Sequence, residues 1–233
     1  MANIYLPQPP PVKTEPQLLR WFTEVWKKLG RKGAVLGALK FGDLNNNTEF
    51  EDDGTLKFNG TATVWDDINL PASNLQPGAT PPTWGAFFVS GGIQGYLFSP
   101  TAANMLHTSS EIVHRYKEGT DIQVHVHWMP TTTNIGAVRW GLEYVWVNNS
   151  GAIASAPTTI YIGTTSVGTA WAHQRSDFPA IVGTGKTIGS AIVMRVFRDA
   201  TNAADTFTGN AAMIQIGIHY EIDTIGSRSK SDK

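Results

Sequence analysis

Two histidines carry the clearest chemical potential in the sequence. His125 and His127 lie two apart within residues 119–128, GTDIQVHVHW, which we predict to form a strand. Successive side chains of a strand point to opposite faces, so both imidazoles point the same way. Imidazole nitrogens are common ligands of transition metals, and the pair therefore raises the question of a metal site.

The spacing of these histidines matches the start of a known metal motif and then departs from it. Gly119, followed after five residues by His125 and then His127, matches the opening of the cupin motif, and cupins are jelly-roll proteins. That motif requires a Glu three or four residues after the second His, where this chain has residues 128–131, WMPT. We expect no metal and no cofactor. A cupin-like metalloenzyme remains an alternative, with the candidate ligands His125, His127 and His219.

A hydrogen-bonded polar face explains the histidines without a metal. We predict a hairpin over residues 120–147, with the histidines on the polar side of its first strand and Arg139 and Glu143 on the polar side of its second. The last strand of the chain adds two more polar residues on one face. The predicted face, solvated or in contact with another copy, consists of Gln123, His125, His127, Arg139, Glu143, His219 and Glu221.

The sequence contains no other pattern typical of a catalytic site. There is no Ser in a nucleophile-elbow context, no Gly-rich phosphate loop and no Cys nucleophile. The carboxylates of Asp66, Asp67, Asp199 and Asp205 have no spacing that indicates glycoside hydrolysis, although sequence alone does not exclude it. We therefore predict a protein without enzymatic activity and name no catalytic residue.

Composition narrows the class of protein. Charged residues make up 16% of the 233 residues and the net charge is −1, so no overall field attracts nucleic acid or an anionic membrane. The absence of Cys excludes disulfides and Cys-based zinc sites. No stretch approaches the roughly 18 apolar residues of a membrane helix, and the N-terminus does not have the pattern of a signal peptide.

Beyond about residue 35 the pattern is that of β-structure. Short strand-like runs are separated by turns, and Asp53-Gly54 is a strong tight-turn signal. From Ile214 to Ile222 apolar and polar residues alternate, which is typical of an antiparallel sheet with one face on the core. We predict an all-β fold, an antiparallel β-sandwich or jelly roll. Its parts are an N-terminal anchor arm and helix (1–33), the β-sandwich body (34–225) and a disordered tail (226–233).

One amphipathic helix is expected before the body. A Pro-rich arm, residues 1–13, leads into residues 14–30, where Thr14 and Gln17 fit a capping box and Gly30 can end the helix. A helix of about 15 residues is marginal alone, so its wide apolar surface must be buried. The sequence leaves open whether that surface packs on the body or on another copy. We assign it to an anchor or oligomer interface made of Leu18, Leu19, Trp21, Phe22, Val25, Trp26 and Leu29.

Several segments occur in a distinctive order: GTLKFNGTATVWDDINLP, YKEGTDIQVHVHWMP, GAVRWGLEYVW and RDATNAADTFTGNAAMIQIGIHYEIDTIGS. In this order they resemble structural proteins of tailed bacteriophages, most of which are known only as virion or hypothetical phage proteins. The resemblance covers roughly residues 40–227 and does not include the arm or the helix. It implies a β-rich virion component made in the host bacterial cytoplasm, and it supplies no catalytic residues.

An arm, a helix and a compact body, in that order, are expected of an anchor and a projecting head. We predict a homotrimeric head-decoration or fibre-like protein, because phage projections are commonly three-fold and closed cyclic symmetry is the normal way to bury identical patches. Its expected partners are further copies of itself and capsid, portal or tail components, with no nucleic acid and no membrane. The alternative is a receptor- or glycan-binding knob of a tail fibre, which would contact a host-surface glycan through Trp84 and Trp171.

Overall fold

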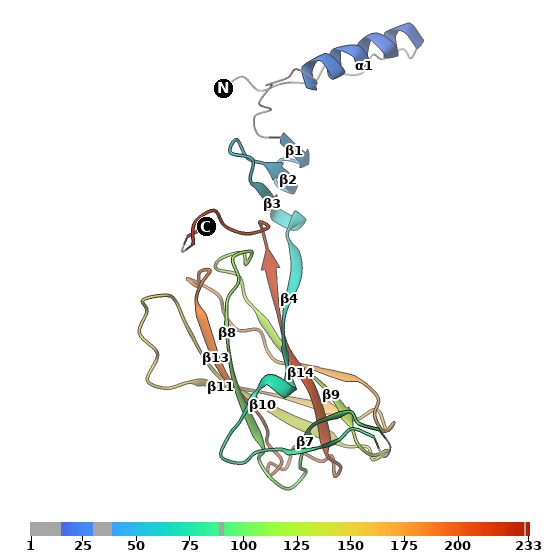
Figure 1. The fold of residues 1–233 in the computed structure, drawn as a ribbon, viewed down its shortest axis with the longest axis vertical. Coiled ribbons are helices and arrows are strands. Elements are labelled where there is room, and N and C mark those ends of the chain that lie inside the picture. The colour runs from blue at the N-terminus through green and yellow to red at the C-terminus, as the bar shows by residue number, and fades with distance from the viewer. Residues whose placement is uncertain (1–14, 30–38, 89–90, 231) are drawn as a thin grey trace. The chain divides into compact units, whose positions relative to one another are not determined.

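Strands dominate the computed structural model, which describes residues 15–29, 39–88, 91–230 and 232–233 (Figure 1). The predicted all-β fold class with one short helix is confirmed. Contacts divide the chain into two compact units, residues 1–64 with 223–225, and residues 65–222 with 226–233. This division differs from the expected boundary after residue 33.

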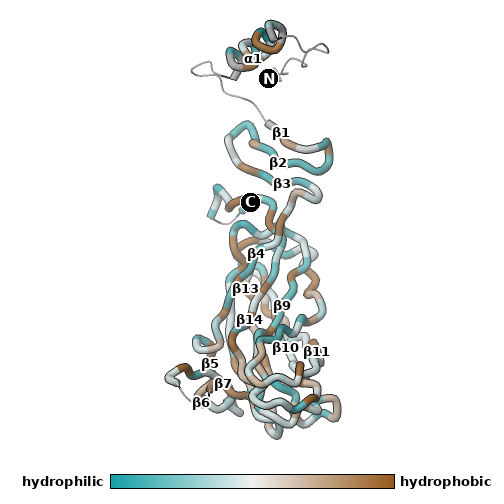
Figure 2. Tube along the Cα trace, turned by 90° about the vertical axis from the view of Figure 1, so that its right-hand side faces the viewer, coloured by the Kyte–Doolittle hydropathy of each residue, from teal (hydrophilic) through white to brown (hydrophobic). Residues whose placement is uncertain are grey.

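The smaller unit contains the predicted helix as α1, Glu15–Leu29. Thr14 and Gly30, the expected caps, lie outside the described residues, as does the Pro-rich arm. Hydrophobic and hydrophilic residues alternate along α1 in Figure 2, as expected of an amphipathic helix. No helix in the described part of the chain is long and apolar enough to cross a membrane.

A three-stranded antiparallel sheet completes the smaller unit. Its order is β1-β2-β3, with β1 Leu39–Gly42, β2 Asn47–Phe50 and β3 Leu56–Asn59. The turn between β2 and β3 uses the predicted tight-turn residues. Gly54 has a φ of 86°, which glycine adopts without strain, and its N–H donates to the Glu51 carbonyl at 2.8 Å.

Two sheets form the larger unit. One has the order β11-β10-β13-β8-β5, and the other has the order β12-β9-β14-β7-β6, with β4 also paired to β14. The strands are β4 Val64–Pro71, β5 Gln76–Pro77, β6 Thr83–Ala86, β7 Gln94–Phe98, β8 Met105–Glu111, β9 Gln123–Pro130, β10 Ala137–Val147, β11 Thr158–Thr165, β12 Gln174–Asp177, β13 Ala191–Arg198 and β14 Ala211–Ile222.

The predicted hairpin over residues 120–147 is wrong. β9 and β10 are consecutive in the chain but belong to different sheets, so residues 131–136 cross from one sheet to the other. Each strand has an apolar face, as predicted, and these two faces meet across the core. The alternation of a strand shows which side is buried but not which strand pairs with it.

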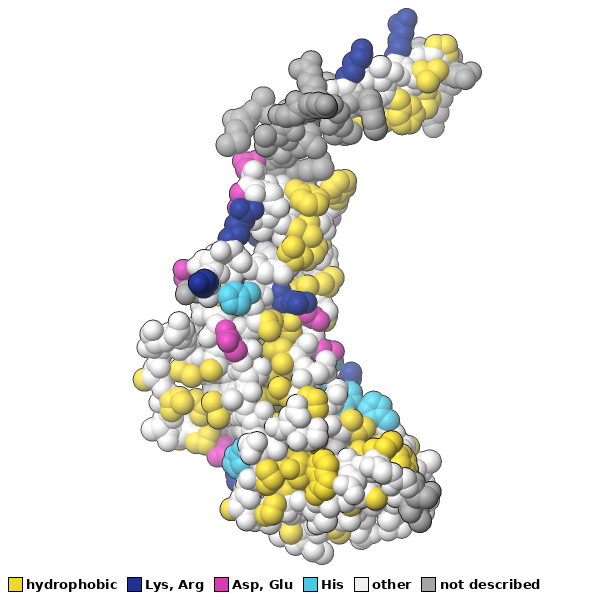
Figure 3. Space-filling model, in the orientation of Figure 1, with side chains coloured by type: hydrophobic (Ala, Val, Ile, Leu, Met, Phe, Trp, Pro, Cys, Tyr) yellow, Lys and Arg dark blue, Asp and Glu magenta, His cyan; other side chains and the backbone are white. Residues whose placement is uncertain are grey.

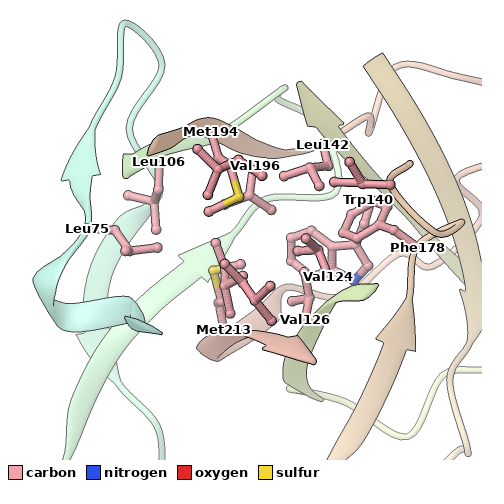
Figure 4. Close-up of a cluster of buried hydrophobic side chains, with 14 of the residues drawn as sticks. Leu75, Leu106, Val124, Val126, Trp140, Leu142, Phe178, Met194, Val196 and Met213 are labelled. Atoms are coloured by element: carbon pink, nitrogen blue, oxygen red, sulfur yellow. The ribbon is translucent and has the colours of Figure 1, made fainter. Parts of the chain in front are cut away.

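The core lies between the two sheets (Figure 4). Val124, Val126 and Met213 come from one sheet, and side chains of β8, β10 and β13 oppose them. The labelled residues of the opposing sheet are fully or almost fully buried: Leu106, Trp140, Leu142, Met194 and Val196.

Arg198 is a charged residue buried inside this apolar environment. It ends β13 and is 0% exposed, and its guanidinium donates to both carboxylate oxygens of Asp205, at 3.0 and 2.8 Å. Its remaining N–H groups donate to the carbonyls of Phe98, Gly209 and Phe207. All five donors of the side chain are therefore used, which is the condition for a stable buried arginine.

The C-terminal tail, residues 226–233, was expected to be disordered. Two of its described residues have hydrogen-bond partners: Ser227 Oγ lies 2.5 Å from His114 Nδ1, and Lys233 Nζ donates to the Arg115 carbonyl at 3.4 Å. These bonds join the tail to the segment before β9.

Replacing Arg198 should destabilise the body strongly. Arg198→Met leaves the Asp205 carboxylate buried without its partner, which typically costs about 3–5 kcal/mol. We expect the free energy of unfolding, measured by urea denaturation with tryptophan fluorescence, to fall by that order.

Arg175→Met is the matched control. Its ion pair with Asp177, 3.0 Å long, is partly exposed, and such pairs contribute at most about 1 kcal/mol. Equal losses in the two variants would contradict a special role for the buried pair.

Candidate functional site

A cluster of two histidines and one aspartate lies on the larger unit. Asp67 comes from β4, His125 from β9 and His219 from β14, and β14 is paired to both of the other strands. One nitrogen or oxygen from each of the three side chains lies within 4.8 Å of the others. The sheet thus brings together residues that are far apart in the sequence.

The His125 ring occupies space left free by a glycine. Gly217 is opposite His125 in the β9–β14 register, and a Cβ at that position would lie 2.2 Å from His125 Nε2. The ring lies 4.3 Å from that of His219 between centroids, and the residue is only 2% exposed. Burial, and then the neighbouring His219, lower the pKa of His125 to about 4, so the imidazole is neutral at pH 7.

The other two members of the cluster are in direct polar contact. His219 Nε2 and Asp67 Oδ1 are 2.8 Å apart, and both side chains are partly exposed. The adjacent Asp66 is already engaged, because it accepts hydrogen bonds from Tyr220 Oη at 2.8 Å and from Arg115 at 2.7 Å. Burial alone would raise the pKa of Asp66, but the hydrogen bonds and the Arg115 charge hold it below its ordinary value.

A cleft of about 340 Å³ opens beside the cluster. Its lining includes two members of the cluster, Asp67 and His219, so a small ligand can reach them. The other lining residues are Trp65, Asp66 and Gln123.

The predicted polar face is divided by the structure. Gln123, His125 and His219 lie together, and the His127 ring lies 4.8 Å from that of His125 between centroids, while His127 Nδ1 lies 2.7 Å from His173 Nε2. Burial, and then the neighbouring His173, lower the pKa of His127. Glu221, expected beside His219, pairs with Lys117 at 2.8 Å.

Arg139 and Glu143 belong to the other sheet, so their assignment to the histidine face is wrong. Both lie on β10, where Arg139 pairs with Asp199 at 2.9 Å and Glu143 with Arg195 at 2.5 Å. The error follows directly from the hairpin that the sequence suggested.

The predicted anchor helix presents apolar side chains to solvent. Leu19 and Phe22 are more than half exposed, and Leu18, Trp21 and Val25 are partly exposed. The side chains of Trp26 and Leu29 lie outside what the structure describes.

The three-stranded sheet has a second exposed apolar surface, which the sequence analysis did not identify. In its register Phe41, Thr48 and Phe58 are neighbours across the strands, and so are Phe50 and Leu56. Directly paired residues share a face, so these four hydrophobic residues form one surface, which we call the apolar sheet face. Phe41 is 59% and Phe50 45% exposed, and hydrophobic side chains gather over β1–β3 in Figure 3.

The opposite face of this sheet is polar and internally paired. Lys40 and Glu49 form an ion pair at 3.1 Å, and Asn59 donates to Glu49 at 3.1 Å and to Asn47 at 3.0 Å. The sheet therefore has one polar face whose groups satisfy each other and one apolar face open to a partner.

The two tryptophans proposed for glycan contact differ in exposure. Trp84 is 47% exposed on the edge strand β6, and its Nε1 donates to Gln94 at 2.7 Å. Trp171 is less exposed and packs near Phe87 and Phe88, with ring centroids 6.3 and 5.2 Å away. Of these two tryptophans, Trp84 has the more exposed ring.

No family model matches the chain, and no curated protein matches it. Solved structures with partial likeness include a family 35 carbohydrate binding module from Clostridium thermocellum, at 9% identity, covering 66% of this chain and 97% of that chain, with a TM-score of 0.40. Another is CBM35 from Cellvibrio japonicus Abf62, at 6% identity, covering 72% and 99%, with a TM-score of 0.39. A third is a cycloisomaltooligosaccharide glucanotransferase from Paenibacillus, at 13% identity, covering 86% and 22%, with a TM-score of 0.43. At these values the likeness carries no argument about function.

A side chain at position 217 should disturb the cluster. In Gly217→Ala the new methyl group would overlap the His125 ring, which has to move within a packed site. Such overpacking typically costs about 1–3 kcal/mol, and we expect that loss in the free energy of unfolding.

Gly163→Ala is the control, because a Cβ at Gly163 on β11 meets nothing within 4 Å. Its effect should stay within about 0.5 kcal/mol. If Gly217→Ala were equally mild, the ring could not be confined as described.

Proposed function

We propose that this chain is a non-enzymatic structural component of a phage virion, a homotrimeric head-decoration or fibre-like protein. In this proposal the smaller unit joins the copies and fastens them to the particle, while the larger unit is displayed. The single observation that supports it best is the apolar sheet face, formed by Phe41, Phe50, Leu56 and Phe58.

The apolar sheet face is too large a fraction of its sheet to remain open. The three strands have four residues each, and a sheet of this size needs a packed hydrophobic face for stability. Burying two phenylalanine side chains contributes roughly 1.5–3 kcal/mol each. Covering this face would therefore stabilise the sheet by a free energy comparable to the net free energy of unfolding of a small domain.

Further copies of the chain are the partner that this surface suits. The apolar sheet face contains no charged residue, so it offers nothing to select a charged partner. Identical apolar faces can bury one another around a symmetry axis, and closed rings limit the assembly. Leu19 and Phe22 of α1 are also exposed apolar side chains, so the helix too needs a partner that covers them.

The virion assignment rests on the sequence resemblance to tailed-phage structural proteins. Such a component has to attach to the particle and expose a folded domain. An adhesive N-terminal part and a β-sandwich do this without any catalytic activity in the β-sandwich.

The oligomeric state tests the assembly. We expect the full chain to be a trimer by light scattering and native mass spectrometry at micromolar concentration. Phe41→Ser with Phe50→Ser should shift it toward monomer, because the contact loses its largest apolar groups.

Lys40→Ser on the opposite face of the same strand is the matched control and should leave the trimer intact. A wild-type chain that stays monomeric would refute the proposal. A trimer unaffected by the double substitution would remove the apolar sheet face from the interface.

Glycan binding is the second candidate function, and Trp84 is the observation that favours it. The indole is held by its bond to Gln94 and by an edge-to-face contact with Tyr96 at 4.9 Å, and it remains nearly half exposed. A fixed, open aromatic ring with polar neighbours can stack on the apolar face of a sugar.

A glycan array with the full chain tests this function. Any glycan bound by the wild type should be lost with Trp84→Ala and kept with Trp65→Ala, since Trp65 is an exposed tryptophan on a different strand. Binding that survives Trp84→Ala would exclude this surface.

A further inference from the structure

The geometry points to a binding site for a divalent transition metal, Zn(II) in the first place, formed by Asp67, His125 and His219. The three side chains bring one ligand atom each within 4.8 Å of the others, from three adjacent strands. This inference does not depend on the proposed virion function, because it concerns only the larger unit.

The ligand set selects the class of metal. Two imidazoles with one carboxylate suit Zn(II) and similar transition metals, whereas Ca(II) and Mg(II) prefer oxygen ligands alone. Atoms bound to one Zn(II) at about 2.1 Å can be no more than about 4.2 Å apart. The His219–Asp67 distance of 2.8 Å already meets this limit. The distances from these two residues to His125 are at most 4.8 Å, so only a small contraction is needed there.

His125 provides an independent sign that the cluster takes a ligand. Its Nδ1 is buried and has no hydrogen-bond partner among the described residues, and an unsatisfied buried nitrogen costs about 1–3 kcal/mol. The missing side chain at Gly217 lets the ring lie toward His219. A metal ion shared with His219 and Asp67 would use the lone pair of a ring nitrogen of His125.

The neighbouring titratable groups have other partners, and none of them joins the three residues whose ligand atoms lie within 4.8 Å of one another. His127 faces His173, Asp66 binds Tyr220 and Arg115, and Asp177, opposite His125 on β12, pairs with Arg175 at 3.0 Å. The ligand set thus excludes His127, which the sequence analysis had named as a candidate ligand. It includes Asp67, which the sequence analysis had not named as a ligand.

One side of the cluster is open to solvent. Asp67 and His219 line the cleft of about 340 Å³, together with Gln123, the residue opposite His219 on β9. With three protein ligands, a tetrahedral ion would keep a fourth position toward this cleft. A water molecule or an oxygen of a small ligand would complete the coordination there.

Metal titration of untagged full-length protein tests the site. After treatment with a chelator, the wild type should bind one Zn(II) per chain in isothermal titration calorimetry. Co(II) should bind competitively and give the absorption of a low-coordinate site. Asp67→Asn and His219→Asn, both at partly exposed positions, should each weaken Zn(II) affinity at least about tenfold.

His173→Asn is the matched control, because His173 is a nearby histidine outside the ligand set. It should retain the wild-type affinity, with circular dichroism verifying the fold of every variant. Zn(II) should also raise the Tm of the wild type but not of Asp67→Asn, because an ion that binds only the folded state stabilises it. No saturable binding in the micromolar range would overturn the inference. An affinity that falls with His173→Asn but survives Asp67→Asn would also overturn it.

Discussion

The larger unit depends on satisfying one buried guanidinium. Arg198 ends β13 in one sheet, and its N–H groups reach carbonyls at the end of β7 and just before β14, both in the other sheet. Asp205, in the loop between β13 and β14, neutralises the charge and also accepts the Arg139 N–H at 2.9 Å. The crossing from one sheet to the other is therefore fixed by hydrogen bonds, and this crossing sets the position of β14. Gly217 and His219 occupy their places in the cluster because that strand is held.

The sequence predicted burial well and strand pairing poorly, for one physical reason. The alternation in β9 and β14 correctly separated Val124, Val126 and Ile218 from the histidines on the opposite faces of these strands. Period-two alternation follows from the geometry of a single strand, so it can be recognised locally. Pairing depends on the path of the connecting loops, and residues 131–136 form a crossing where a hairpin turn was expected. Arg139 and Glu143 were misplaced for that reason alone.

The sequence also predicted only part of the candidate site: the histidines, but not the residues that surround them. His125 and His219 were visible as histidines on the polar faces of strands, but nothing near Asp67 indicated that β4 would lie beside β14. The sequence analysis gave Gly217 no role, and its importance appears only when His125 is known to lie opposite. The apolar sheet face was missed because its strands are only four residues long. Alternation over so few residues becomes meaningful only once the register is known.

The order of the strands has a consequence for synthesis on the ribosome. β9 lies between β12 and β14, and β8 pairs with β13, so neither sheet can close until the last strands have left the exit tunnel. Until then the nascent chain exposes strand edges and apolar faces that have no partner, which is the condition under which aggregation competes with folding. Chaperones that shield such edges during translation should therefore matter more for the yield of this protein than for one built from local hairpins.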